Sequence, residues 1–178
     1  MKTLYLLILT LVFSVSAIAQ TQLDRNVGLD FYRQGEYEKA INNLQKIVES
    51  EEKDRLAWLY LGASYLKTKK EKEALKAFQR VKGIYNKNMP VYEKKLKITS
   101  KQRAQYTDSA RRFGIYGTVK VAVEFSADGK IGFVFPFQGL PYGLTENVVK
   151  TFEQIKFEPA EIGGKAVTTI QVLEYSFS

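Results

Sequence analysis

The sequence predicts an α+β protein, with all-α helical hairpins in its N-terminal half and a small β-β-α-β domain at its C-terminal end. Three observations lead to this prediction. The chain repeats itself at a spacing of 34 residues near its start, and its hydrophobic pattern changes to strict alternation at Gly117. The first 20 residues form a separate apolar segment that has to be set aside before the fold is considered.

The N-terminal segment has the pattern of a secretory signal peptide. Lys2 precedes an apolar stretch from Leu4 to Ala19, which ends in small residues before Gln20. Crossing a bilayer takes about 20 apolar residues, so this stretch is short for an anchor. We assign residues 1–19 to a cleaved signal peptide. The alternative is that the segment stays uncleaved and anchors the protein in a membrane.

Residues 21–88 are expected to form two helical hairpin repeats. A shift of 34 residues places Gly28 on Gly62, Phe31 on Tyr65, Ala40 on Ala74 and Leu44 on Phe78. This is the period of the tetratricopeptide repeat, whose units usually bind other proteins. Helices are expected at 22–34, 37–50, 55–68 and 71–83, with Gly35 in the first turn. An ordinary pair of helical hairpins explains the apolar faces but not the shared period.

Residues 89–113 are expected to form a helical cap and linker. A repeat buries its apolar surface against its neighbours, and about three units are usually needed, so something has to cover the second one. Pro90 can open a helix and Ser100 can cap the start of another. We therefore expect helices between the repeats and a final domain over 114–178.

The final domain reads as strand, strand, helix, strand. Val119, Val121, Val123 and Phe125 alternate with other residues, which is typical of a half-buried strand. The turn at 127–130 leads into a returning strand, Ile131 to Phe137, and one amphipathic helix follows over 144–155. A turn at Gly163 and Gly164 precedes a last strand, 167–177.

The apolar parity slips within this last strand. Ile170 and Val172 share one face, whereas Leu173, Tyr175 and Phe177 share the other. Such a slip is typical of a bulge or of a strand that leaves the sheet partway, and it also fits an edge strand.

Residues 114–178 resemble the C-terminal domain of TonB, the protein that links the inner membrane to outer-membrane receptors. The residues that carry the resemblance are Gly117, Asp128-Gly129, Pro141, Leu144, Phe157, Pro159-Ala160, Gly164-Lys165, Val167, Tyr175 and Phe177. In that family the domain binds a short extended receptor segment along an edge strand. The resemblance implies that the stretch Val167 to Tyr175 binds such a segment by strand addition. The alternative is that this strand is paired or covered.

The resemblance also implies an envelope function. We expect a periplasmic adaptor that binds outer-membrane receptors or other envelope proteins, and no enzyme. The alternative is a membrane-anchored, TonB-like energy transducer. TonB proper has an anchor with a histidine and a long proline-rich arm, whereas this chain has no histidine and only 4 prolines.

Composition removes most familiar catalytic sites. The chain has no cysteine and no histidine. It therefore has no disulfide, no thiolate or imidazole metal ligand, no cysteine nucleophile and no histidine general base. We expect no cofactor and no metal. The net charge is +8, and the excess lies in residues 51–112. It is explained either by a solvated helical exterior or by attraction to an acidic partner or an anionic membrane surface. Nucleic acid is not expected as a partner.

Two groups of residues are the candidate partner-binding sites. The tetratricopeptide resemblance places the first group on the concave surface, where its cations and tyrosine would clamp an acidic tail. Its members are Arg25, Leu29, Tyr32, Arg33, Leu59, Ala63, Leu66 and Lys67. The alternative is that they are ordinary solvated or packing residues. The second group is Ile170, Gln171 and Val172 in the last strand.

Overall fold

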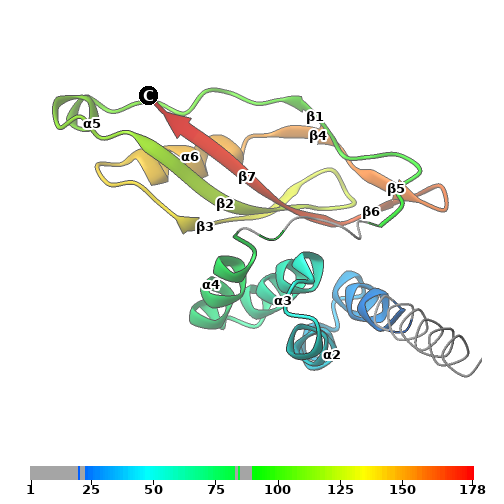
Figure 1. The fold of residues 1–178 in the computed structure, drawn as a ribbon. Helices are drawn as coiled ribbons and strands as arrows, with labels where there is room; N and C mark the ends of the chain where they lie inside the picture. The colour runs from blue at the N-terminus through cyan, green and yellow to red at the C-terminus, as the bar shows by residue number, and fades with distance from the viewer. Residues whose placement is uncertain (1–19, 21–22, 83, 85–89) are drawn as a thin grey trace, which may run out of the picture.

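A computed structural model describes residues 20, 23–82, 84 and 90–178 and arranges them in three layers (Figure 1). The helical repeats lie against one face of a three-stranded antiparallel sheet. Helix α6 (Leu144–Phe152) covers the opposite face. The α+β class is confirmed. The expected signal peptide lies outside the described residues.

The helices of the repeats lie where the 34-residue period places them. A first helix covers residues 23–33, and α2 (Tyr37–Ser50), α3 (Arg55–Lys67) and α4 (Glu71–Arg80) follow. Gly35 has a φ of 80° in the first turn. Lys69, at the same position of the second repeat, has a φ of 61°, a left-handed conformation that is uncommon for residues other than glycine.

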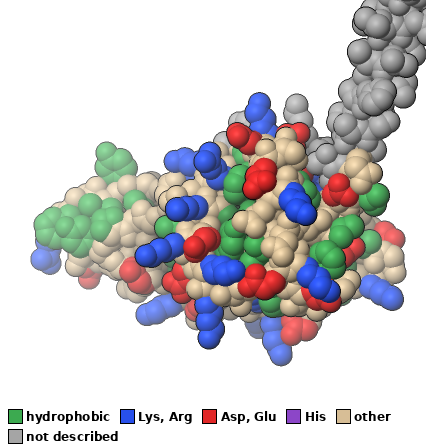
Figure 2. All heavy atoms as spheres, turned by 90° about the horizontal axis from the view of Figure 1, so that it is seen from below, with side chains coloured by type: hydrophobic (Ala, Val, Ile, Leu, Met, Phe, Trp, Pro, Cys, Tyr) green, Lys and Arg blue, Asp and Glu red, His purple; other side chains and the backbone are tan. Residues whose placement is uncertain are grey.

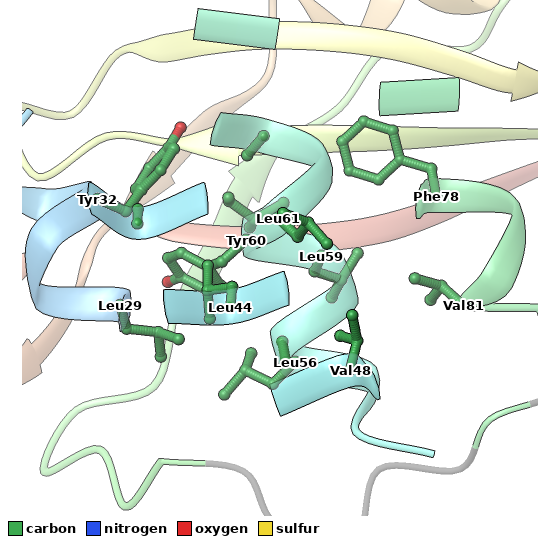
Figure 3. Packing of buried hydrophobic residues seen from close by; sticks show 14 of the residues in the cluster. Leu29, Tyr32, Leu44, Val48, Leu56, Leu59, Tyr60, Leu61, Phe78 and Val81 are labelled. Atoms are coloured by element: carbon green, nitrogen blue, oxygen red, sulfur yellow. The ribbon is translucent and has the colours of Figure 1, made fainter. Parts of the chain in front are cut away.

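The two repeats also pack in the same way. A β-carbon added to Gly28 would lie 2.7 Å from the Leu44 side chain, and one added to Gly62 would lie 2.7 Å from the ring of Phe78. Each glycine thus lets the second helix of its own hairpin approach closely. Figure 3 shows side chains from these helices, among them Leu44, Leu61 and Phe78, gathered in one core.

The sheet has the order β3-β2-β7, with β2 (Gly117–Phe125) in the centre. Its neighbours are β3 (Ile131–Gln138) and β7 (Thr169–Phe177), and both pairings are antiparallel. Gly129, with a φ of 82°, makes the predicted turn between β2 and β3. The predicted order of strand, strand, helix and strand is confirmed for these elements.

The central strand is buried on both faces, so the expectation of a half-buried strand is wrong. Val119, Val121 and Val123 face α6, whereas Ala122 packs with the helices of the repeats. Glu124 also points to the repeats and is buried. The alternating pattern describes the α6 face correctly, but it gives no sign that a second module covers the other face.

The same sandwich explains the parity slip in β7. Ile170 and Val172 pack against the repeats, and Leu173, Tyr175 and Phe177 pack on the α6 side. The register with β2 runs without a shift from Gly117↔Phe177 to Phe125↔Thr169. The expected bulge or departure from the sheet is therefore wrong, because each half of the strand faces a different apolar layer.

The expected helical cap over 89–113 is also wrong. Within the described residues of this stretch, only α5 (Asp108–Arg112) is helical, and Thr107 caps it. Ser100 ends a short strand, β1 (Lys97–Ser100), which pairs with β4 (Lys156–Glu158). Ala104 and Ala110 are buried in the core beneath α6, so this stretch belongs to the sheet domain. The strands β5 (Ala160–Ile162) and β6 (Lys165–Val167) form a separate hairpin.

The sheet itself covers the second repeat. The ring of Phe78 in α4 lies 6.4 Å from Phe133, 5.6 Å from Phe135 and 6.1 Å from Phe137, all in β3. Alternate residues of a strand point to the same face, so these three phenylalanines form one apolar stripe on the repeat side of the sheet. This stripe buries the apolar surface that two repeats leave open.

Candidate functional site

The free edge of β7 is the first candidate site. Within the described residues, β7 pairs with β2 along its full length and with no strand on its other side. Ile170 is buried against the repeats, Val172 is partly buried on the same side, and Gln171 lies opposite Val123. Because these side chains lie above and below the sheet, it is the backbone of β7 that lines the edge. The prediction of an edge strand is confirmed.

The other edge of the sheet, along β3, suits strand addition less well. β3 contains Pro136, which has no backbone N–H, and proline in a sheet is confined to positions where that N–H would face away from the ladder. A peptide added to β3 would lose one hydrogen bond there. β7 contains neither proline nor glycine over its nine residues. The two edges therefore differ in the donors that they present.

Several of the predicted repeat residues are not exposed, so they do not form an open concave surface. Leu29, Tyr32, Leu59 and Ala63 are buried, and Leu66 packs against the same core. Arg25 donates to Asp54 at 3.0 Å, and the side chains of this pair are only 5% and 7% exposed. These residues hold the repeats together and bind them to the sheet, and this burial contradicts the expected exposure.

A buried polar junction lies where the repeats meet the sheet. The Tyr32 hydroxyl donates to Oε2 of Glu124 over 2.8 Å, and Nζ of Lys67 pairs with the same oxygen over 2.9 Å. Lys67 also lies 5.8 Å from the centre of the Phe133 ring. The expected chemistry, a tyrosine and a cation around a carboxylate, is thus present, but here the carboxylate belongs to the protein's own β2.

Gly132 makes room for this junction. A β-carbon on Gly132 would lie 2.5 Å from Cδ of Glu124, so no larger residue fits beside the carboxylate without displacing it. The pairing of β2 with β3 shifts register at this point, between Glu124 and Phe125. No sequence pattern singled out Glu124, because it occupied the face of β2 that the alternation assigned to solvent.

A second polar contact joins the modules at the start of β7. The hydroxyl of Tyr60 in α3 donates to the carbonyl oxygen of Thr168 over 3.1 Å. Burial raises the pKa of Tyr60 above its ordinary value. Burial, and then the charge of Glu124, raises the pKa of Tyr32 in the same direction. Both hydroxyls therefore stay protonated and act as donors in the folded protein.

Arg33 differs from the other predicted cations. Its Nη1 donates to Asp30 at 2.9 Å, and its side chain is 20% exposed. Its Nε and Nη2 are buried without a hydrogen-bond partner among the described residues. Among the other repeat cations that were predicted to bind an acidic ligand, Arg25 has one such nitrogen, its Nε, so Arg33 retains more unused donors.

The charged surface of the repeats carries both signs. Figure 2 shows lysines and arginines interspersed with acidic side chains over the helical face. Lys70 pairs with Glu38 at 3.2 Å and Lys39 with Glu36 at 2.9 Å. Mixed charges of this kind favour a solvated exterior over a single anion-binding surface.

The described residues show no cluster of three or more acidic side chains that could hold a metal ion. In the same part of the chain, no helix has the length and apolar character needed to span a bilayer.

Comparison with known proteins agrees with the two modules. Residues 28–88 match the tetratricopeptide repeat family, and residues 102–178 match the family described as Gram-negative bacterial TonB protein C-terminal. Among solved structures, the solution NMR structure of the Pseudomonas aeruginosa TonB C-terminal domain is 26% identical, with a TM-score of 0.39. That match covers 47% of this chain and 85% of the other. No curated protein matches.

The TonB match begins at residue 102, which agrees with the packing of 104–110 into the sheet domain. Both families are protein-interaction domains rather than enzyme families. The chain thus combines a segment that matches the tetratricopeptide repeat family with a following segment that matches the TonB C-terminal family.

Proposed function

We propose that this protein is an adaptor of the cell envelope that binds an extended segment of an outer-membrane receptor along the free edge of β7. The match of residues 102–178 to the TonB C-terminal family and the match of residues 28–88 to the tetratricopeptide repeat family support a role in protein interaction. The observation that carries the proposal is the one-sided pairing of β7 in the described structure. The protein would then work by binding and without catalytic residues.

Strand addition to β7 has a simple physical basis. An edge strand presents unpaired N–H and C=O groups on alternate residues, and an incoming peptide completes the ladder. At about 3.3 Å per residue, the nine residues of β7 offer an edge roughly 30 Å long. The side chains of Ile170, Gln171 and Val172 would hold β7 in place by packing on the two faces of the sheet. Their backbone N–H and C=O groups would bind the partner.

The repeats would serve as a brace for this edge. The Tyr32–Glu124–Lys67 junction and the contact from Tyr60 to Thr168 fix the repeats to the face of the sheet. An edge strand that is held on both faces is pre-organised, so less conformational entropy is lost when a partner binds. Arg33, whose side chain is partly exposed, would be the repeat residue that pairs with an acidic partner group.

Amide hydrogen exchange tests the edge directly. In the free protein, alternate amides of β7 should exchange rapidly, because only every second N–H points to β2. A peptide from the periplasmic segment of a receptor should protect the rapid set and leave β3 unchanged. Protection along β3 instead, or none in either strand at saturating receptor, would contradict the proposal.

Cross-linking adds a matched control, because the chain contains no native cysteine. Ser176 is exposed on β7 and Glu49 is exposed on α2. A photoreactive group on Ser176→Cys should cross-link the receptor peptide, whereas the same group on Glu49→Cys should not. In the otherwise unlabelled protein, Ser176→Lys should weaken binding, because lysine on an edge opposes strand pairing.

The location is proposed together with the function. We propose that residues 1–19 are a cleaved signal peptide and that the mature protein works in the periplasm. The apolar stretch of Leu4 to Ala19 supports export. Intact-mass measurement of the protein from cells should give a chain that begins at Gln20. A full-length mass in the membrane fraction would favour the anchored energy transducer instead.

A further inference from the structure

Three aromatic side chains stand exposed together at one end of the molecule. Phe113 is 61% exposed, Tyr116 77% and Tyr142 46%, and we call these residues the aromatic tip. Phe113 and Tyr142 stack with their ring centres 5.0 Å apart and their planes 18° apart. Figure 2 shows apolar side chains gathered at the end of the molecule where Figure 1 places α5 and the turn between β3 and α6.

The backbone is held in a form that displays these rings. Tyr142 has a φ of 58°, a left-handed conformation that costs free energy for a residue with a side chain. The Thr107 hydroxyl donates to the carbonyl oxygen of Tyr142 over 2.8 Å, and Thr107 also caps α5. Thr107 therefore links two segments: the turn that contains Tyr142, and helix α5, which ends directly before Phe113. The tip is a built feature rather than a loose loop.

Basic side chains accompany the aromatic tip. Arg111 and Arg112 end α5 directly before Phe113, and both are exposed. Within the described residues, neither forms an ion pair with a carboxylate. Arg111 lies over the Tyr106 ring at 4.8 Å, which leaves its charge at the surface. Projecting aromatic rings beside unpaired arginines are complementary to an apolar layer edged by negative charge.

We propose that the aromatic tip binds the headgroup region of an anionic lipid bilayer. Tyrosine suits that region because its ring enters the apolar boundary while its hydroxyl reaches the headgroups. Arginine adds attraction to anionic lipids. The rings project from a convex end of the molecule, which suits insertion into a surface (Figure 2). Such a contact is weak and reversible, and it is independent of strand addition at β7.

A fluorescent probe on the tip tests this contact in the full chain. Ser109 is exposed in α5, one helical turn before Phe113, so Ser109→Cys can carry an environment-sensitive dye beside the rings. With vesicles of phosphatidylcholine and phosphatidylglycerol, the emission should shift to the blue. Vesicles of phosphatidylcholine alone should give a weaker shift. A dye on Glu49→Cys in α2 should report no change, even if the N-terminal segment holds the protein on the vesicle.

Replacing the three aromatic residues by serine should lower the tip's partition into anionic vesicles by about tenfold or more, because each ring loses its apolar burial. Circular dichroism checks that the triple variant folds, and the single Tyr116→Ser change tests the same point at the most exposed ring. The proposal is overturned by three results: no shift with anionic vesicles, a shift that survives the triple replacement, or a concentration-dependent shift without vesicles, which would assign the tip to self-association.

Discussion

Replacement of Glu124 by alanine should weaken the docking of the helical repeats on the sheet domain. Glu124 is buried and accepts from Tyr32 at 2.8 Å and from Lys67 at 2.9 Å. A hydrogen bond to a charged group contributes about 1.5–3 kcal/mol. The side chain of Lys67 is 27% exposed and can turn to water, so loss of its ion pair with Glu124 adds about 1 kcal/mol at most. Glu124→Ala should therefore lower the free energy of unfolding by about 1.5–4 kcal/mol.

Glu124→Gln is the matched control for charge. Its amide oxygen still accepts from Tyr32, but the ion pair with Lys67 is lost, so the expected cost is about 1 kcal/mol. Urea unfolding should be followed by circular dichroism and by the fluorescence of Trp58, the only tryptophan, which lies in α3. Circular dichroism reports both modules and Trp58 reports the repeats. In the alanine variant the two transitions should separate, because the modules no longer unfold together.

Gly132 provides an internal check on this reasoning. Gly132→Ala places a β-carbon 2.5 Å from Cδ of Glu124, so it should cost about 1–3 kcal/mol in the native background. In the Glu124→Ala background the obstacle is gone and most of that cost should vanish. Two results would show that the junction does not hold the modules together as described. One is that Gly132→Ala lowers the free energy of unfolding equally in both backgrounds. The other is that the free energy of unfolding of Glu124→Ala lies within about 0.5 kcal/mol of the native value.

Other substitutions test the remaining contacts. Phe78→Ala should lower the free energy of unfolding by about 3–5 kcal/mol in urea, because it removes a fully buried ring that touches β3. Asp54→Ala should cost about 3–5 kcal/mol by the same assay, since it leaves Arg25 buried without its partner and removes the cap of α3. Stability should also fall as pH rises above about 10, because unfolded Tyr32 releases its proton near the ordinary pKa of 10.0 and the folded residue keeps it. Urea midpoints between neutral and alkaline pH should fall less steeply in Tyr32→Phe than in the native chain, and equal slopes would show that Tyr32 does not ionise on unfolding.

The local pattern fixed much of the fold correctly. The 34-residue period located the helices and placed Gly28 and Leu44 in register with Gly62 and Phe78, because a repeat has to keep the same small and large residues at the same positions. Alternation from Gly117 located β2 and β3, because a strand places every second side chain on the same face. These features depend on residues that are close in the chain, within one element or one hairpin, so they can be predicted from the sequence.

The candidate site was only partly visible in the sequence. The edge strand could be expected from the TonB resemblance and from the slip in β7, but the cause of that slip could not. The prediction that Leu29, Tyr32 and Leu59 are exposed was wrong, because the concave surface of a tetratricopeptide repeat is open only when nothing covers it. In this chain the sheet covers it, and Glu124, 92 residues from Tyr32, supplies the acceptor.

The sequence by itself determined the two modules, their helices and the main strands, because periodicity records which face of each element avoids water. Only the tertiary structure decided that the repeats dock on the sheet, that β2 is buried on both faces, and that residues 97–112 belong to the sheet domain. Docking depends on how two apolar faces from distant parts of the chain match in shape and charge. No local spacing encodes that match, so the buried junction could not be located before the modules were placed together. The aromatic tip depended instead on the fold of the sheet domain, which stacks Phe113 on Tyr142.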